Sequence, residues 1–105
     1  MKLRDKYTCP LEITHDIIKG KWKPIILWIL KDGDKSLSYL EKNIQGITQK
    51  MLLEHLKELQ EYEIIGKRNY EGYPLKVDYF LTGRGTKLLQ ALTIMQSVGD
   101  EILHS

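Results

Sequence analysis

The sequence predicts a mainly α domain that carries one small β-hairpin. Three observations predict it. The chain has 105 residues, a length that one hydrophobic core can organise. Apolar residues recur at helical spacing along most of it. One pair of β-branched and aromatic runs, at residues 64–70 and 76–81, flanks a segment rich in turn residues. We therefore expect residues 1–105 to form a single domain.

Two helices are predicted in the first third of the chain. Pro10 and Glu12 are typical of a first helical turn, because proline is preorganised for it and an acid favours the helix dipole. This helix should end just before Gly20, which suits a left-handed cap. A second, nearly all-apolar helix should hold Pro24 in its first turn and end at residues 32–34, Asp-Gly-Asp.

Two more helices should follow, joined by a tight turn that contains a glycine. Ser38 and Glu41 have capping-box spacing, so we expect a short helix over residues 39–44. Thr48 can cap a longer helix that reaches about Tyr62. Three leucines recur at helical spacing on its inward face: Leu52, Leu56 and Leu59.

The last third of the chain should hold the hairpin and a long helix. Residues 71–75, Glu-Gly-Tyr-Pro-Leu, should form a mobile tip between the strands at 64–70 and 76–81. Thr82 can cap a final helix over about 82–104. Five residues of that helix follow the 4-3-4-3 spacing of a helix-packing seam: Leu88, Leu92, Met95, Gly99 and Ile102.

Together these elements predict a winged helix-turn-helix. Two short helices joined by a glycine-containing turn, at about 36–62, match the helix-turn-helix, whose second helix lies in the DNA major groove. That pattern alone is also common in helical hairpins that never contact DNA. The hairpin at about 64–81 supplies the wing. We therefore expect a winged helix-turn-helix with N- and C-terminal dimerisation helices.

Composition restricts the other classes of function. The net charge is only +2, and residues 49–63 carry two lysines against four glutamates, so a DNA interface has to come from the placement of charge. The single cysteine and three histidines lack metal-ligand spacing, and no nucleophile–base pair or phosphate-binding glycine loop is present. We expect no enzyme activity, no metal and no cofactor. No apolar run approaches the roughly 20 residues of a membrane span, so we expect a cytoplasmic protein.

Several short motifs resemble the HxlR family of bacterial winged-helix regulators. They are Cys-Pro-Leu-Glu at 9–12, Gly-Lys-Trp-Lys at 20–23 and Gly-Ile-Thr-Gln-Lys at 46–50, and further matches continue in the family's order to residue 99. The resemblance implies a homodimer that binds an operator near a target promoter, with repression as the usual outcome. In some members of the family, a cysteine near the N-terminus controls DNA binding.

The helix that begins after Thr48 carries the candidate DNA contacts. Recognition helices act through their N-terminal residues, and each side chain on the outward face suits a base edge or a phosphate. The candidates for base edges are Gln49, Lys50, Leu53 and Glu54, and those for phosphates are Thr48 and Lys57. The alternative is a solvated face held by pairs such as Lys50 with Glu54, each worth about 0.2–0.5 kcal/mol.

The hairpin carries three cations that could follow the phosphate backbone: Lys67, Arg68 and Lys76. Strand alternation places Lys67 and Arg68 on opposite faces, so only one of them should point at DNA. We expect Arg68 and Lys76 to make the contacts. The alternative is that all three are edge-strand cations that discourage aggregation.

Cys9 is a candidate sensor of thiol-reactive compounds. It precedes a helix N-terminus, which favours a thiolate, and Lys6 lies just upstream. A small electrophile or oxidant acting there could release DNA. The alternative is a small buried apolar residue.

The sequence also suggests two surfaces for binding other protein chains. The seam from Leu88 to Ile102 should pair two copies of the chain, presenting two recognition helices about 34 Å apart to an inverted repeat. The rival to DNA binding is a winged-helix module that binds protein. The acidic residues Glu54, Glu58 and Glu61 favour that rival.

Overall fold

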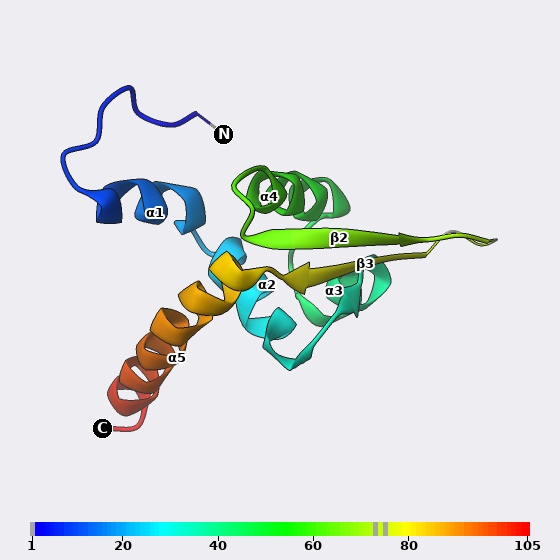
Figure 1. Cartoon of the computed structure of the whole chain (residues 1–105). Coiled ribbons are helices and arrows are strands. Elements are labelled where there is room, and N and C mark those ends of the chain that lie inside the picture. Colours follow the sequence, from blue (N-terminus) through cyan, green and yellow to red (C-terminus); the bar gives the residue numbers. More distant parts are fainter. Residues whose placement is uncertain (1, 73, 75) are drawn as a thin grey trace.

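The computed structural model describes residues 2–72, 74 and 76–105, and it has the predicted fold class. Tyr73 and Leu75, which the sequence places at the hairpin tip, lie outside the described residues. In chain order the elements are α1 (Pro10–Ile18), α2 (Trp22–Ile29), the 3-10 helix η1 (Leu30–Asp32), β1 (Lys35–Ser36), α3 (Leu37–Asn43), α4 (Gln49–Glu61), β2 (Ile65–Tyr70), β3 (Lys76–Leu81) and α5 (Gly83–Leu103). The hairpin and α5 extend away from the helical body in different directions (Figure 1).

The hairpin belongs to a three-stranded antiparallel sheet in the order β1-β3-β2. Residues directly opposite each other in such a ladder share a face. Lys67 pairs with Tyr79, and Arg68 pairs with Asp78, so these two cations lie on opposite faces as expected. The sequence did not predict β1, because two residues are too few to show strand alternation.

That short strand explains one wrong prediction. The α3 helix is capped by Ser36, whose hydroxyl accepts from the Tyr39 backbone N–H at 3.0 Å, and not by Ser38. Pairing with Asp78 holds Ser36 extended at the end of β1, so its oxygen faces the first helical turn. Ser38 is already inside the helix.

The second helix ends earlier than predicted, since α2 stops at Ile29 and the 3-10 helix η1 continues to Asp32. The other predicted helix boundaries are confirmed. Thr48 caps α4 by accepting from the Met51 backbone N–H at 3.1 Å. Thr82 caps α5 by accepting from the Gly85 N–H at 3.1 Å. The first helix begins at Pro10, and Gly20 takes a φ of 100° beyond its end. Leucine spacing places the inward face of α4 correctly, because Leu52, Leu56 and Leu59 are all buried.

Gly85 allows the long helix to start close to the sheet. A Cβ at this position would lie 2.1 Å from the Ile64 carbonyl oxygen. That carbonyl also accepts from the Thr82 backbone N–H at 3.2 Å, and it shares the Thr82 hydroxyl proton, at 2.9 Å, with the Glu63 carbonyl, at 2.6 Å. A side chain larger than hydrogen would therefore separate α5 from the strand that carries the wing.

The predicted seam on α5 divides into two parts. Leu92 is 5% exposed and Leu88 is partly buried, and both pack on the core of their own chain. Further along, Met95 and Ile102 are 62% and 69% exposed. The cause is the path of α5, which leaves the body after packing on α2 (Figure 1). Among the described residues, no helix is both long and apolar enough to span a membrane.

Candidate nucleic-acid interface

The first turns of α4 present a surface that the rest of the chain leaves open. With the three leucines turned inward, the predicted contact residues are all exposed: Thr48, Gln49, Lys50, Leu53, Glu54 and Lys57. Leu53 is 42% exposed, so its methyl groups are accessible from outside. The structure thus leaves all six predicted residues exposed, Thr48 at the N-cap and the other five within α4.

Contacts within the chain fix the start of this surface and leave most of its polar side chains without a partner among the described residues. The Gln49 side-chain amide donates to the Glu41 carboxylate at 3.1 Å, which ties α4 to α3. Lys50, Glu54 and Lys57 form no ion pair with any described residue. The Lys50–Glu54 pair that would favour a merely solvated face is therefore not formed, and both side chains remain available.

On the hairpin, Arg68 is held against its own sheet. Its guanidinium lies 4.5 Å from the centroid of the Phe80 ring and is paired with the Asp34 carboxylate. The Phe80 ring in turn covers Gly66, where a Cβ would come within 2.3 Å of it. A hydrogen bond with Tyr70 and the charge of Asp34 raise the pKa of Arg68 above its ordinary value.

The other two hairpin cations differ in their surroundings. The Lys76 ammonium lies 5.1 Å from the centroid of the Tyr70 ring, so it also rests on the Arg68 face. Lys67 is exposed and forms no ion pair with a described residue. Its cross-strand partner Tyr79 belongs to the core that α4 packs on, so Lys67 shares the α4 side of the sheet. The sequence had favoured Arg68 over it.

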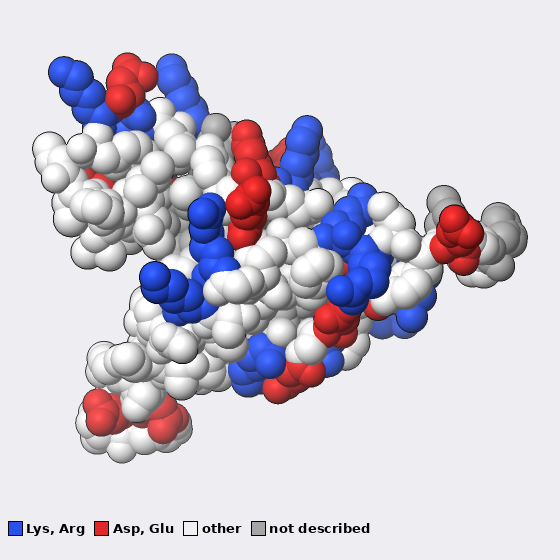
Figure 2. Space-filling view, in the orientation of Figure 1, with Lys and Arg blue, Asp and Glu red and all other residues white. Residues whose placement is uncertain are grey.

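The charge pattern near α4 is mixed, and one of its acids faces inward. Lys/Arg and Asp/Glu side chains alternate over the face in Figure 2, with no continuous basic surface. Glu58 pairs at 3.5 Å with Lys23, whose side chain is only 5% exposed and also donates to the Ile17 carbonyl at 2.9 Å. Burial acts to raise the pKa of Glu58, yet the net shift is downward, and the Lys23 charge contributes to it. Glu58 is therefore a structural residue, which weakens the acidic surface expected for a protein-binding module.

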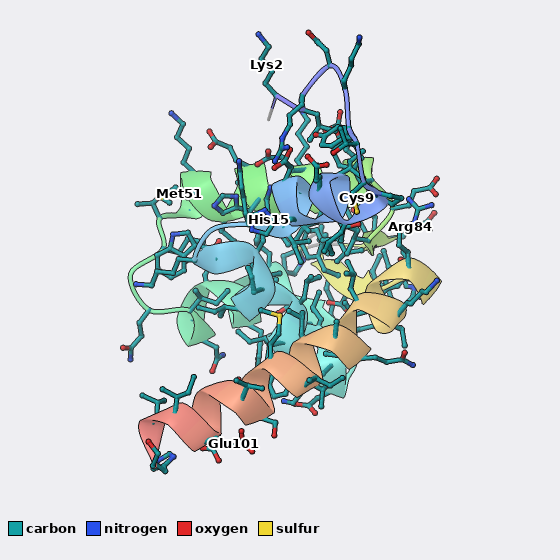
Figure 3. The ribbon with its side chains drawn as sticks, turned by 90° about the vertical axis from the view of Figure 1, so that its left-hand side faces the viewer. Lys2, Cys9, His15, Met51, Arg84 and Glu101 are labelled. Atoms are coloured by element: carbon teal, nitrogen blue, oxygen red, sulfur yellow. The ribbon has the colours of Figure 1, made fainter. Side chains whose placement is uncertain are left out.

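Cys9 is exposed and forms the N-cap position of α1. The segment before it is fixed along α1 by Asp16, a buried carboxylate that pairs with Arg4 at 2.8 Å and accepts from the Tyr7 hydroxyl at 2.9 Å. These hydrogen bonds, from Arg4 first and then Tyr7, lower the pKa of Asp16 although burial opposes them. Figure 3 shows Cys9 on the same side of the molecule as Arg84 of α5.

A metal centre has no support in this geometry. Within residues 2–72, 74 and 76–105, no three His, Cys, Asp or Glu side chains gather closely enough to hold a metal ion.

Comparison with known proteins identifies the family. A sequence model described as HxlR-like helix-turn-helix matches residues 17–105. The chain belongs to this HxlR-like family.

Similar proteins named as regulators agree with this family assignment. The HTH-type transcriptional regulator YodB of Bacillus subtilis is 36% identical, over 89% of this chain and 84% of its own. A protein of Fusobacterium mortiferum named MalR is 39% identical over 96% of both chains. The structure of the redox regulator HypR in its reduced form superposes with a TM-score of 0.85 at 35% identity, covering 89% of this chain and 92% of HypR. The present chain is thus a transcriptional regulator of the winged helix-turn-helix type.

Sequence reasoning missed three residues that position the interface of this HxlR-like chain. Asp34 holds Arg68, Glu41 orders Gln49, and Lys23 anchors Glu58 of α4. The partners in each pair are 34, 8 and 35 positions apart, so no local spacing rule could have joined them. One signal was present for Lys23, which lies between Trp22 and Pro24 in an otherwise apolar helix, where a cation needs a partner.

Proposed function

We propose that this HxlR-like regulator binds an inverted-repeat operator as a homodimer, with α4 in the major groove, and acts as a repressor. The observation that carries the proposal is the open N-terminal face of α4. Thr48 caps that helix, three leucines fix its orientation, and its outward polar side chains have no ion-pair partners within the described residues. In a helix-turn-helix regulator this is the surface that reads base edges.

The residues divide into two roles. Gln49, Lys50, Leu53 and Glu54 contact base edges, since their donors, acceptors and methyl groups match those of the major groove. Thr48 and Lys57 contact phosphates and set the register. On the hairpin, Lys67 contacts the flanking backbone, because it is exposed, forms no ion pair with a described residue and lies on the α4 side of the sheet. The sequence favoured Arg68 and Lys76, but both lie on the opposite face, where Arg68 is paired with Asp34.

Homodimerisation through α5 accounts for its exposed apolar residues. Beyond Leu92, five large apolar side chains of the described residues are 48–80% exposed: Ile94, Met95, Val98, Ile102 and Leu103. They recur at helical spacing along a helix whose second half leaves the body, as expected for a surface that a second copy covers. Gly99 lies between them with open space above its Cα, so another helix can approach closely there. Light scattering should give twice the chain mass, and a monomer at micromolar concentration would contradict this part.

The proposed signal is a thiol-reactive compound or oxidant acting on Cys9. The thiol is exposed and lies at a helix N-terminus, two features that favour reaction. Two similar structures support the idea. HypR, a redox regulator, has been solved in reduced and oxidised forms, and YodB has been solved after diamide treatment, with a TM-score of 0.76 at 35% identity over 91% of this chain and 96% of YodB. Diamide should lower operator affinity in the natural chain and leave it unchanged in Cys9→Ser.

The test of DNA binding is a mobility shift on DNA from around the protein's own gene, at two salt concentrations. We expect specific binding that weakens with salt. Lys57→Ala should weaken binding to all sequences and reduce the salt slope by about 1. Lys31→Ala is the matched control, because that lysine pairs with Asp32 in η1 and lies over the Trp28 ring. Absence of any preference over random DNA at low salt would refute the proposal and favour a protein-binding module.

A further inference from the structure

A groove of about 430 Å³ lies where α1, the end of α4 and the start of α5 meet. Its floor is aliphatic and comes from three separate elements: Ile13, Ile17, Ile64 and Leu88. Two cations, Arg84 and Lys87, lie at its rim. Small-molecule sites in proteins typically measure about 300–1,000 Å³ and combine an apolar lining with a few placed polar groups. The groove has the size and composition of such a site.

The two cations of the groove have no acidic partner. Arg84 and Lys87 are one turn apart on α5, both are exposed, and neither forms an ion pair with a described residue. Arg84 is nevertheless held in place, since its Nη1 donates to the Tyr62 carbonyl at 2.7 Å. That bond uses one of the five N–H donors of a guanidinium, and the others can serve a ligand. Arg84 is therefore a fixed positive charge at the rim, and Lys87 adds a second positive charge beside it.

The position of Arg84 in α5 is electrostatically unfavourable for the free protein. It lies in the first turn of a helix of 21 residues that has no acid in that turn, and Lys87 follows in the next turn. The positive end of the helix dipole repels cations there and favours anions. An anion at the rim would interact favourably with both side chains and with the dipole.

We propose that this groove binds a small carboxylate that carries an apolar ring, and that its occupancy changes the affinity for the operator. The ring lies on the aliphatic floor, and the carboxylate lies between Arg84 and Lys87. The binding step stands on the groove alone, whereas the effect on the operator rests on the function proposed above.

The route to DNA affinity follows from the elements that an occupant contacts. Tyr62 ends α4, the proposed recognition helix, and Leu88 belongs to α5, the proposed dimerisation helix. The third wall is α1, where Cys9, Ile13 and Ile17 recur every four residues and so lie along one side of the helix. A ligand that prefers one relative placement of α4 and α5 shifts the population toward it, and with it the spacing of the two recognition helices.

Methyl NMR on the full chain with labelled isoleucines tests the binding step. Phenylacetate should shift the methyl resonances of Ile13, Ile17 and Ile64 and leave that of Ile44, which follows α3 and does not line the groove, unmoved. Phenylacetamide, the neutral isostere, should bind at least about tenfold more weakly, because it loses the charge-assisted contacts. Acetate, which lacks the ring, should also bind weakly. No shift with phenylacetate, or equal affinity for phenylacetamide, overturns the proposal.

Charge variants locate the site. The double variant Arg84→Gln/Lys87→Gln should lose at least about tenfold in phenylacetate affinity while keeping its circular dichroism, because both side chains are exposed. Lys31→Gln, which is outside the groove, should bind as the natural chain does. Unchanged affinity in the double variant overturns the assignment.

The effect on DNA is measured separately. Saturating phenylacetate should change operator affinity at least about threefold in the natural chain and not in Arg84→Gln/Lys87→Gln. No change at saturation overturns the effector role. Failure to bind the operator without ligand counts against the proposed function, and the NMR result for the groove stands independently of it.

Discussion

Replacing Gly85 by alanine should loosen the joint between the wing and α5. The new Cβ would lie 2.1 Å from the Ile64 carbonyl oxygen and 3.2 Å from Leu81 Cδ2. Even a close C···O contact is about 3.3 Å, so the carbonyl and the helix must separate by roughly 1 Å. The carbonyl is backbone and cannot rotate away as a side chain would. Thr82, whose N–H and hydroxyl both donate to it, must follow or lose these bonds.

The expected loss of stability is the sum of three contributions. Inserting a methyl group into a packed site costs about 1–3 kcal/mol. Weakening two hydrogen bonds to one carbonyl costs about 0.5–1.5 kcal/mol each. Alanine gains about 1 kcal/mol over glycine in a helix interior, which offsets part of this. We expect Gly85→Ala to lower the free energy of unfolding by about 3 kcal/mol.

Urea unfolding at one fixed protein concentration measures this loss. Gly83→Ala is the matched control, since it lies in the same first turn and a Cβ there meets nothing within 4 Å. It should be as stable as the natural chain or slightly more stable. A Gly85→Ala variant with an unchanged urea midpoint would show that α5 does not approach β2 as described.

Three further predictions concern the seam, the buried ion pair and the N-terminal segment. The added methyl group of Gly99→Ala meets open space within one chain, so this variant should stabilise α5 by up to about 1 kcal/mol. It should nevertheless weaken the homodimer, as measured by sedimentation equilibrium. An unchanged dimer dissociation constant would show that Gly99 is not part of the dimer seam. Lys23→Met should lower the free energy of unfolding in urea by up to about 3 kcal/mol, because Glu58 loses one of its charged partners and keeps His55, and Lys23→Met/Glu58→Met should recover part of this; equal loss in both would assign the cost to packing alone. The pKa of Asp16 is lowered in the folded chain, so its contribution to stability is present above about pH 4 and is lost as the pH falls through the folded value. Asp16→Asn should accordingly be less stable than the natural chain at pH 7, and the difference in free energy of unfolding should shrink as the pH falls through the folded pKa of Asp16. A difference that stays constant down to acid pH would contradict the assignment.

Features with a local signature were predictable from the sequence. The caps at Thr48 and Thr82 depend on a side chain and an N–H three residues apart, so their spacing can be read directly. The inward face of α4 follows from leucines at helical spacing. The two-residue strand β1 has no pattern of its own and exists only because β3 pairs with it, which is why the cap at Ser36 was missed.

The orientation and ion-pair partner of each charged side chain were less predictable. Strand alternation indicated that only one of Lys67 and Arg68 should face DNA, and it could not decide which. The orientation of Arg68 depends on Asp34 and Phe80, which come from other parts of the chain. The sequence placed Glu58 in an acidic outer face of α4, whereas in the structure its carboxylate pairs with Lys23. Pairings between residues far apart in sequence are set by tertiary packing, and one sequence holds no direct record of them.

The central claim is that α4 reads base edges, and selection of bound sequences from a random DNA pool tests it most directly. The natural chain and Lys50→Ala would be compared, with Lys67→Ala as the backbone-contact control. We predict that Lys50→Ala relaxes the preference at symmetry-related positions of the two half-sites, whereas Lys67→Ala weakens binding without changing the preferred sequence. The claim would be contradicted if the natural chain and Lys50→Ala selected the same DNA sequences, and if variants at Gln49 and Leu53 also left the selected sequences unchanged.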